Sequence, residues 1–422
     1  MTLDNWFDHL RSLHQHRDTY SLDRIDSVAT RLSLKYFDCP VIVITGTNGK
    51  GSTAKTLESI YTQAGYRTGL YTSPHLLQFH ERIRIANRDV LDAELLRAFE
   101  AIENSRNGVI LSVFEFTTLA ALWLFQRASL DIMILEAGLG GRLDAVNIVE
   151  HDITAVTSIA LDHTTILGDT RDAIAFEKTS IARENKIIVV GDENPPQKLF
   201  DVIHEKKAKH CQIHRDFSYE LKNDVMIYRG KKTISFPVPR LKPQNIATAL
   251  SIVENLNERL PVSEKNCAQG IAKTSWPGRF EKVDFPFPMI LDVAHNPEAG
   301  AWLAAQYQRL PTVSQTIAVV GMLQDKDMIA TVSPLLPLVD VWLVCGLISE
   351  NAERGSNGAV IAGFLREQGK MYRLFSTVHD AMNVLYTEHC QNHCNRALIF
   401  GSFHTVAAGK RWIQSRMSCK QE

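Results

Sequence analysis

The stretch VIVITGTNGKGS, residues 41–52, decides the fold of this chain. An apolar, β-branched run ends in a turn with three glycines, and a segment with helical periodicity begins at about Ser52. Glycines allow positive φ and close backbone approach, and the N–H groups at the start of a helix carry partial positive charge. This strand–turn–helix order predicts a phosphate-binding loop.

The spacing of this loop differs from the usual pattern G-x-x-x-x-G-K-[ST]. Only two residues separate Gly46 from Gly49, and Gly51 stands between Lys50 and Ser52. Lys50 is nevertheless placed to supply a point charge for the β- and γ-phosphates. The alternative is an ordinary strand–helix turn with an incidental lysine; the run Gly-Asn-Gly-Lys-Gly-Ser favours phosphate binding.

Composition limits the class of protein. A chain of 422 residues exceeds one ordinary core, so two domains are expected. The 46 Lys and Arg against 47 Asp and Glu give a formal charge of −1, which argues against nucleic acid or an anionic membrane as partner. The apolar window 116–125 is too short for a membrane span and predicts a buried helix. Residues 1–18 lack the apolar core of a signal peptide.

The seven cysteines are scattered and odd in number, which is typical of a reduced, cytoplasmic protein. The segment HCQNHC, residues 389–394, could be drawn as a zinc site. It lacks a second, spaced pair of ligands, so we favour a solvated helix end.

Strand-like and helical segments alternate along the chain. The first series of apolar runs covers 41–45, 131–138, 153–159 and 186–191, and the second covers 289–300, 316–323, 341–347 and 397–403. The proline-rich segment 283–288 lies between the two series and indicates a hinge. We therefore expect an α/β protein: residues 1–284 form a mostly parallel sheet with the phosphate loop, and residues 285–422 form a smaller Rossmann-like domain.

Polar residues follow two further strands of the first series. Glu136 ends one strand, and Asp162 and His163 follow the next. Ligands of open α/β sheets bind at the carboxyl ends of the strands, and magnesium prefers oxygen ligands. Each residue also has a structural explanation, Glu136 as a buried ion-pair partner and His163 as a core histidine. Together with the glycine-rich turn 138–144 they predict a metal site beside the terminal phosphate.

Eight motifs, in chain order, resemble those of the folylpolyglutamate synthases and dihydrofolate synthases, which belong to the wider Mur ligase group of ATP-dependent amide ligases. The motifs are GTNGKGS (46–52), SPHL (73–76), LEAGLGGRLDAVN (135–147), SIALDHT (158–164), EKTSI (177–181), WPGRFE (276–281), LDVAHNPEA (291–299) and GSFHTVA (401–407). The unusual loop spacing is characteristic of this group.

The resemblance implies a reaction. ATP phosphorylates the carboxylate of dihydropteroate or of a reduced folate such as tetrahydrofolate, the amine of L-glutamate attacks the acyl phosphate, and an amide, ADP and phosphate result. Positioning and charge neutralisation supply most of the catalysis of such a phosphoryl transfer. The implied cofactor is Mg²⁺, with two ions per site, and the implied assembly is a monomer.

The resemblance also implies roles for residues of the first domain. The loop residues Gly46, Thr47, Asn48, Gly49, Lys50, Gly51 and Ser52 bind ATP. Ser73, Glu136 and His163 bind magnesium. Ordinary phosphate loops would instead use the Ser52 hydroxyl as the metal ligand; we prefer Ser73 because Gly51 changes where that hydroxyl points.

Lys50, His163, Lys178 and His295 are the expected catalytic residues. By resemblance Lys178 is carbamylated and positions the second magnesium, although the sequence alone would allow a surface lysine paired with Glu177. Across the hinge, Asn245, Arg279 and Asp292 match the positions that contact ATP.

The folate side is implied by LSVFEF (111–116) and GRLDA (141–145). Its expected contacts are Ser112, Phe114, Glu115, Leu143, Asp144 and Ala145. Phe114 is suited to stack on a flat heterocycle, and Asp144 can accept from a pterin amino group.

Other functions stay open. A folylpolyglutamate synthase without the first activity is the nearest alternative, because Ser112 and Val113 replace a common threonine and aromatic residue. A cell-wall Mur ligase is disfavoured by SPHL and LDVAHNP. An ATP-binding regulatory module would keep the loop without needing Glu136, His163 and Lys178.

Overall fold

The computed structural model describes residues 2–13, 21–348, 354–389 and 395–418. The chain forms two compact units, Met1–Ser275 and Trp276–Glu422.

The first unit is built on a large sheet whose strand order is β4-β3-β2-β5-β1-β6-β7-β8 among the described residues. The six neighbouring strands from β2 to β8 in this order run parallel, whereas β3 and β4 pair antiparallel at one edge. The strands are β1 (Val41–Thr45), β2 (Thr68–Tyr71), β3 (Ile83–Ile85), β4 (Arg88–Asp89), β5 (Ile132–Glu136), β6 (Ile153–Val156), β7 (Ile187–Val190) and β8 (Lys209–Gln212).

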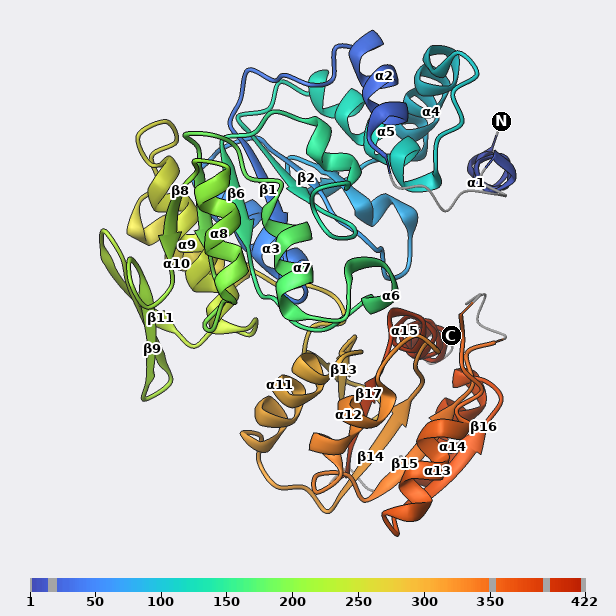
Figure 1. The fold of residues 1–422 in the computed structure, drawn as a ribbon. Coiled ribbons are helices and arrows are strands. Elements are labelled where there is room, and N and C mark those ends of the chain that lie inside the picture. The colour runs from blue at the N-terminus through green and yellow to red at the C-terminus, as the bar shows by residue number, and fades with distance from the viewer. Residues whose placement is uncertain (1, 14–20, 349–353, 390–394, 419–422) are drawn as a thin grey trace. The chain divides into compact units, whose positions relative to one another are not determined.

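Helices cover both faces of this sheet (Figure 1), so its central strands are buried throughout, as continuous apolar runs predict. Helices α3 and α9 pack on one face, and α2, α4, α5, α7 and α8 pack on the other. The helical segments are α1 (Leu3–Leu13), α2 (Asp23–Arg31), α3 (Lys50–Gln63), η1 (Phe79–Arg82), α4 (Asp92–Arg106), α5 (Val113–Gln126), η2 (Ala145–Ile148), α6 (Thr164–Leu167), α7 (Arg171–Thr179), α8 (Gln197–Glu205), α9 (Pro243–Leu256) and α10 (Glu264–Lys273).

The register of the central strands aligns the carboxyl ends that carry the predicted site. Ile44 of β1 lies opposite Glu136 of β5, and Thr45 lies opposite Val156 of β6. Three segments therefore leave the sheet together, at the carboxyl ends of its parallel strands: the phosphate loop, the turn after Glu136 and the loop that leads to His163.

A small antiparallel sheet of β9 (Ser218–Lys222), β10 (Val225–Arg229) and β11 (Thr233–Pro237) completes the first unit. This sheet was not expected from the sequence. In β10 and β11 buried residues alternate with more exposed ones, with Met226 and Tyr228 buried, which is the pattern of a sheet with one solvated face.

The second unit holds a sheet of order β12-β13-β17-β14-β15-β16 among its described residues. The five strands from β13 to β16 run parallel and β12 is antiparallel, so the Rossmann-like prediction is confirmed. The strands are β12 (Glu281–Asp284), β13 (Pro288–Asp292), β14 (Gln315–Val320), β15 (Val341–Cys345), β16 (Met371–Phe375) and β17 (Asn395–Phe400). The helical segments are α11 (Pro297–Gln308), α12 (Met328–Val332), η3 (Ser333–Leu335), α13 (Ala359–Glu367), α14 (Val378–His389) and α15 (Phe403–Ser418).

The division between the units falls upstream of the expected position at residue 285. Strand β12 pairs with β13, Glu281 opposite Leu291 and Asp284 opposite Pro288, and so belongs to the second sheet. The predicted hinge 283–288 is the turn of this hairpin with its flanking strand residues. Asn245, expected across the hinge, lies on α9 in the first unit.

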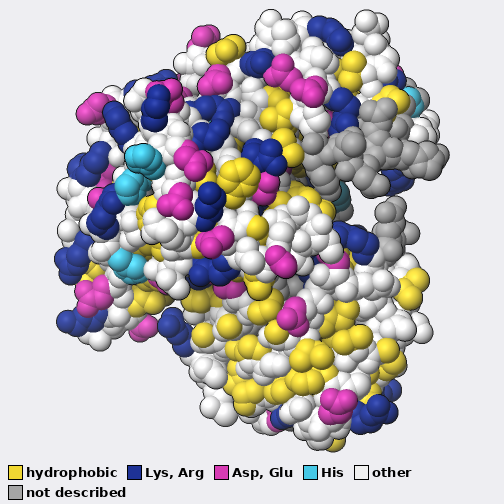
Figure 2. Space-filling view, in the orientation of Figure 1, with side chains coloured by type: hydrophobic (Ala, Val, Ile, Leu, Met, Phe, Trp, Pro, Cys, Tyr) yellow, Lys and Arg dark blue, Asp and Glu magenta, His cyan; other side chains and the backbone are white. Residues whose placement is uncertain are grey.

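The apolar window 116–125 lies in α5 and is almost wholly buried, as predicted. Within the described parts of the chain, no helix is both long and apolar enough to cross a membrane. Most of the segment 389–394 lies outside the described residues. Figure 2 shows acidic and basic side chains interspersed over the visible face of the first unit.

Candidate active site

Glycine is required at two positions of the phosphate loop. Gly46 has φ +139°, and a Cβ there would lie 2.0 Å from the Thr157 Oγ1 atom. Gly49 has φ +89°, and a Cβ there would lie 2.3 Å from Oδ1 of Asn245. Both positions combine positive φ with close packing, so any side chain would displace the loop.

The first half of the loop is hydrogen-bonded to the chain that follows β6. The Thr47 N–H donates to the Ser158 carbonyl at 2.7 Å, and the Asn48 N–H donates to the Ser158 hydroxyl at 3.1 Å. The Thr157 hydroxyl donates to the Asn48 carbonyl at 2.7 Å. Helix α3 begins at Lys50, where the first N–H groups have no acceptor within the helix. The arrangement leaves the start of α3 as the part of the loop suited to phosphate.

Two lysines donate to the same carbonyl oxygen. The Lys50 ammonium lies 3.0 Å from the Gly46 oxygen, and Lys178 Nζ lies 2.8 Å from it. Burial lowers the pKa of the Lys178 amine to about 7, and the charge of Lys50 acts in the same direction, against Asp162 and Asp144. Lys178 is therefore a buried amine that is partly neutral near pH 7.

The structure rules out a surface position for Lys178. Its side chain is 4% exposed, and Glu177 pairs with Arg142 at 2.8 Å instead. The Arg142 N–H also donates to the Glu177 carbonyl, and a Cβ on Gly141 would lie 2.7 Å from the Lys178 carbonyl. The glycine-rich turn after β5 therefore packs directly on the end of α7.

Ser73 and Glu136 lie together at the ends of β2 and β5. The Ser73 N–H donates to Glu136 Oε2 at 3.1 Å, and Glu136 is buried. His163 directly precedes α6 as its N-cap residue, with φ +50°, on the loop that follows β6. Among the described residues no group of three or more His, Cys, Asp and Glu side chains forms a metal cluster. A carboxylate beside a serine still offers the oxygen donors that magnesium prefers.

The predicted folate residues also lie near the end of β5, and several have a structural role. Ser112 and Glu115 form a capping box at the start of α5: the Glu115 N–H donates to the Ser112 hydroxyl, and the Ser112 N–H donates to Glu115 Oε2. Glu115 also pairs with Arg24 at 3.2 Å. Phe114 packs over Gly138, where a Cβ would lie 2.6 Å from the ring.

Asp144 organises the turn in which Leu143 is half-buried and Ala145 buried. Its carboxylate accepts the Leu139 N–H at 2.8 Å and the Val146 N–H at 3.1 Å, so it caps η2. Burial raises the pKa of the Asp144 carboxyl to about 6, against these backbone hydrogen bonds.

The second unit brings together the residues predicted there. Asp292 is buried at the end of β13 and accepts N–H groups from Phe280 at 2.7 Å and Ala294 at 2.8 Å; burial raises the pKa of this carboxyl, and nearby Arg279 opposes the rise. The Arg279 guanidinium lies 5.0 Å from the centre of the Phe403 ring, and the His295 ring lies 6.4 Å from the same ring.

The residues that hold the loop after β6 were not predicted from the sequence. Thr157 and Ser158 bind the phosphate loop, and buried Asp192 accepts the Ile159 N–H. Asp192 is the second residue after β7, so a signal like the one that identified Glu136, an acid near the end of a buried strand, was present there too.

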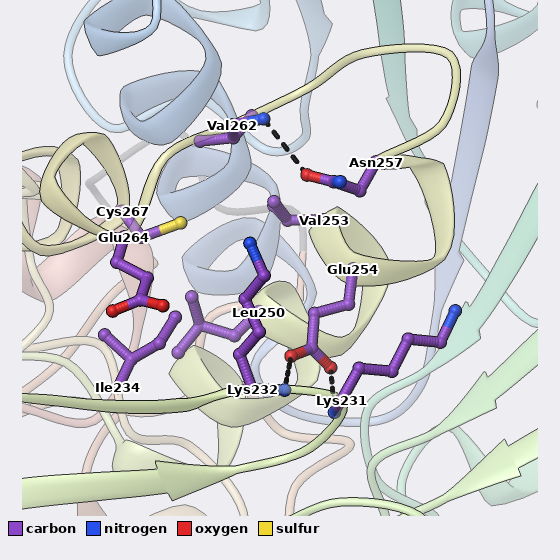
Figure 3. A pocket seen from close by; sticks show the side chains of 10 residues that line it. All are labelled: Lys231, Lys232, Ile234, Leu250, Val253, Glu254, Asn257, Val262, Glu264 and Cys267. Carbon is purple, nitrogen blue, oxygen red and sulfur yellow. Dashed lines mark hydrogen bonds between the residues drawn. The ribbon is translucent and has the colours of Figure 1, made fainter.

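A pocket elsewhere in the first unit is separate from this site (Figure 3). It lies between α9, α10 and the turn that joins β10 to β11, and Glu254 accepts the backbone N–H groups of Lys231 and Lys232 there. The pocket is lined by Lys231, Lys232, Ile234, Leu250, Val253, Glu254, Asn257, Val262, Glu264 and Cys267. None of the predicted site residues lines it.

Comparison with known proteins agrees with this geometry. A family model described as "Mur ligase, glutamate ligase domain" matches residues 278–403. A dihydrofolate synthase/folylpolyglutamate synthase of Escherichia coli is 38% identical over 99% of this chain and 96% of its own length, and one of Haemophilus influenzae is 37% identical over 96% of each.

Solved structures give the same result. FolC of E. coli in complex with DHPP and ADP is 37% identical, with a TM-score of 0.93 over 99% of both chains. A bifunctional folylpolyglutamate synthase/dihydrofolate synthase of Yersinia pestis with AMPPNP and a manganese ion is 38% identical, with a TM-score of 0.90 over 98% of both.

The two α/β units, the glycine loop and the glutamate ligase domain define a ligase of the Mur type, an ATP-dependent class that joins an acid to an amino acid. Within that class, the full-length identities make the assignment specific. The chain belongs to the dihydrofolate synthase/folylpolyglutamate synthase family.

Proposed function

We propose that this protein is a bifunctional ligase that joins L-glutamate to dihydropteroate, forming dihydrofolate, and to tetrahydrofolate, extending its glutamate chain. One observation carries the proposal: three features lie together at the carboxyl ends of the parallel strands, namely the phosphate loop, the Ser73–Glu136 pair and the Phe114–Gly138 contact. The relatives named above carry both activities in their names.

In the proposed reaction the first unit activates the acceptor carboxylate. The start of α3 and Lys50 hold the triphosphate, so Lys50 leaves the Gly46 carbonyl for the β- and γ-phosphates. The γ-phosphoryl group passes to the carboxylate, breaking its bond to the β-phosphate oxygen and forming an acyl phosphate. The glutamate amine then attacks the acyl carbon, loses a proton and displaces phosphate.

Divalent metal would supply charge neutralisation at the transferring phosphoryl group. Ser73, Glu136 and His163 are the residues that would hold it, and a carbamate on Lys178 would hold a second ion. The buried, partly neutral amine of Lys178 suits carbamate formation, because only the neutral amine adds CO₂.

In the second unit, we propose that Arg279 and Asp292 bind ATP and that His295 is a catalytic residue. Asn245, which packs on Gly49, also contacts ATP. We further propose that the enzyme is a monomer that acts in the cytoplasm on ATP, L-glutamate, dihydropteroate and reduced folates.

Phosphate release by the purified protein with Mg-ATP and L-glutamate tests this function. We expect glutamate-dependent release with either dihydropteroate or tetrahydrofolate as acceptor. Release with tetrahydrofolate alone would show that the protein carries out only polyglutamylation. Ser112 and Val113 would then be the expected reason for the missing dihydrofolate synthase activity. Release that depends on neither acceptor would overturn the folate assignment.

A substitution at Gly138 should separate folate binding from ATP binding. In Gly138→Ala the new methyl group would lie 2.6 Å from the Phe114 ring, which must move. We expect KM for both acceptors to rise by roughly 10-fold, the loss of about 1.4 kcal/mol of binding, with KM for ATP unchanged. Steady-state kinetics with each substrate varied in turn checks this. If KM for the acceptors were unchanged, Phe114 would not be part of the folate-binding site.

A further inference from the structure

In the loop between β6 and α6, side chains bind the backbone at Ile159 and Ala160. Both backbone polar groups of Ile159 are taken: its N–H donates to the Asp192 carboxylate, and its carbonyl accepts Arg171 Nε at 2.8 Å. Both groups of Ala160 bind Thr47, whose hydroxyl accepts the N–H at 3.0 Å and donates to the carbonyl at 3.1 Å. The backbone N–H and carbonyl groups of two consecutive residues are thus all hydrogen-bonded to side chains.

Asp192 and Arg171 form an ion pair beside Ile159. The Arg171 guanidinium lies 3.6 Å from the Asp192 carboxylate, whose side chain is 7% exposed. Both residues also bind the backbone of Asn194: Asp192 accepts its N–H at 2.8 Å, and Arg171 donates to its carbonyl at 2.7 Å. Because the pair binds backbone groups of two separate loops, it sets the path of the chain there.

That path ends at a residue in an unfavourable conformation. His163 has φ +50° and is not glycine, a conformation that persists only where the surroundings impose it. Its N–H donates to the Asp162 carboxylate at 2.8 Å, which fixes only the adjacent residue. The hydrogen bonds at Ile159 and Ala160 hold the chain leading into this turn, and Arg171 begins α7, the helix that also carries Lys178.

We propose that Asp192 and Arg171 are positioning residues that hold the 159–163 loop so that His163 faces a divalent metal ion; this rests on the metal site of the proposed function. The imidazole, the Glu136 carboxylate and the Ser73 hydroxyl are donors of a kind that Mg²⁺ or Mn²⁺ accepts. Residues that orient a metal ligand typically contribute 10- to 100-fold to metal affinity.

The test measures Mn²⁺ binding directly, by electron paramagnetic resonance of the full-length protein with ADP, beside steady-state kinetics. We expect Asp192→Ala to weaken Mn²⁺ binding by about 10-fold and to raise the half-saturating Mg²⁺ concentration by the same factor. KM for the folate acceptor should stay within about two-fold of wild type. Arg171→Ala changes a half-exposed side chain and should weaken Mn²⁺ binding too. It keeps the test possible if Asp192→Ala fails to fold.

Asp152→Ala is the matched control. Like Asp192, Asp152 accepts a backbone N–H, here that of Val41 at 3.0 Å, and it pairs with basic side chains, Lys186 and Arg259. It lies at the opposite end of the strands, where they begin. It should lower thermal stability without altering Mn²⁺ affinity. Equal Mn²⁺ affinity in wild type, Asp192→Ala and Arg171→Ala would overturn the positioning role. Absence of Mn²⁺ binding in the wild type would overturn the metal site itself, and the inference with it.

Discussion

Lys178→Met is expected to reduce kcat by roughly 10³-fold, a loss of about 4 kcal/mol of transition-state stabilisation. The reason is chemical as well as electrostatic. Lys178 is buried, its amine has a pKa of about 7, and it lies 2.8 Å from the carbonyl of the first glycine of the phosphate loop. If the amine carries CO₂ as a carbamate, methionine removes an anion from the proposed second metal position.

The modification itself can be observed. In protein equilibrated with ¹³C-bicarbonate, a carbamate carbon resonance should be present in the wild type and absent from Lys178→Met. Lys55→Met is the control, because Lys55 is also a buried lysine of the first unit whose pKa burial lowers, but it pairs with Glu58 on α3. It should lose stability while keeping kcat within about two-fold. Full activity of Lys178→Met would end the carbamate proposal.

The same lysine makes stability depend on pH in CO₂-free buffer. Its pKa is about 7 in the folded chain against 10.5 for an ordinary exposed lysine, so between these values the unfolded chain binds more protons. The free energy of unfolding therefore rises with pH across that window. The penalty for the buried charge is complete below pH 7, so Lys178→Met should exceed wild type in stability most at low pH. Denaturant unfolding at about pH 6 and about pH 9 checks this: the difference in free energy of unfolding between Lys178→Met and wild type should be smaller at about pH 9.

Lys50→Met is the second change with a large expected effect, a loss of roughly 10³-fold in kcat with a smaller change in KM for ATP. Lys50 donates to the Gly46 and Thr47 carbonyls at 3.0 and 3.1 Å, and on the proposed mechanism it exchanges them for phosphate oxygens. Methionine keeps the length and apolar stem of the side chain but not its charge. The loop should fold, because glycines and the Thr157 and Ser158 contacts determine its path.

Single-turnover kinetics with radiolabelled ATP would measure this effect at the phosphoryl-transfer step. The half-buried Lys35, which pairs with Asp26, gives a control variant, Lys35→Met, that should retain wild-type rates. A kcat for Lys50→Met within about three-fold of wild type would show that Lys50 does not stabilise the transferring group.

The sequence predicted the parallel strands β1, β5, β6, β7, β13, β14, β15 and β17, because buried parallel strands are continuous apolar runs. It did not predict β2, β8 or β16, which are not such runs, nor the order of the strands in either sheet. Val41–Thr45 begins and ends as expected, and the helix after the glycine loop differs by about one turn at most. Prediction failed where local pattern and long-range pairing disagree. The prolines of 283–288 indicated a linker, yet Asp284 pairs with Pro288 in a hairpin that only the neighbouring strand can specify.

For the candidate site, residue types at strand ends indicated Glu136 and His163, and resemblance added Ser73 and Lys178. The burial of Lys178 could not be seen in sequence, because the EK pair is equally suited to an exposed helix; Arg142, distant in sequence, takes Glu177 instead. The backbone of Ile159 and Ala160 is hydrogen-bonded to the side chains of Asp192, Arg171 and Thr47. These contacts join residues distant in sequence, so no local sequence pattern indicates them either.

The position of β12 determines where this chain can be cut. A fragment that starts at residue 285 would lose Glu281–Asp284 and leave β13 as an open edge, with the backbone groups of Met289 and Leu291 unpaired. It would also lose the Arg279 and Phe280 contacts to the Asp292 region, including the N–H that Phe280 donates. A fragment that starts at Trp276 keeps the edge covered, so it is the one suited to separate expression and to measuring what the glutamate ligase domain binds by itself.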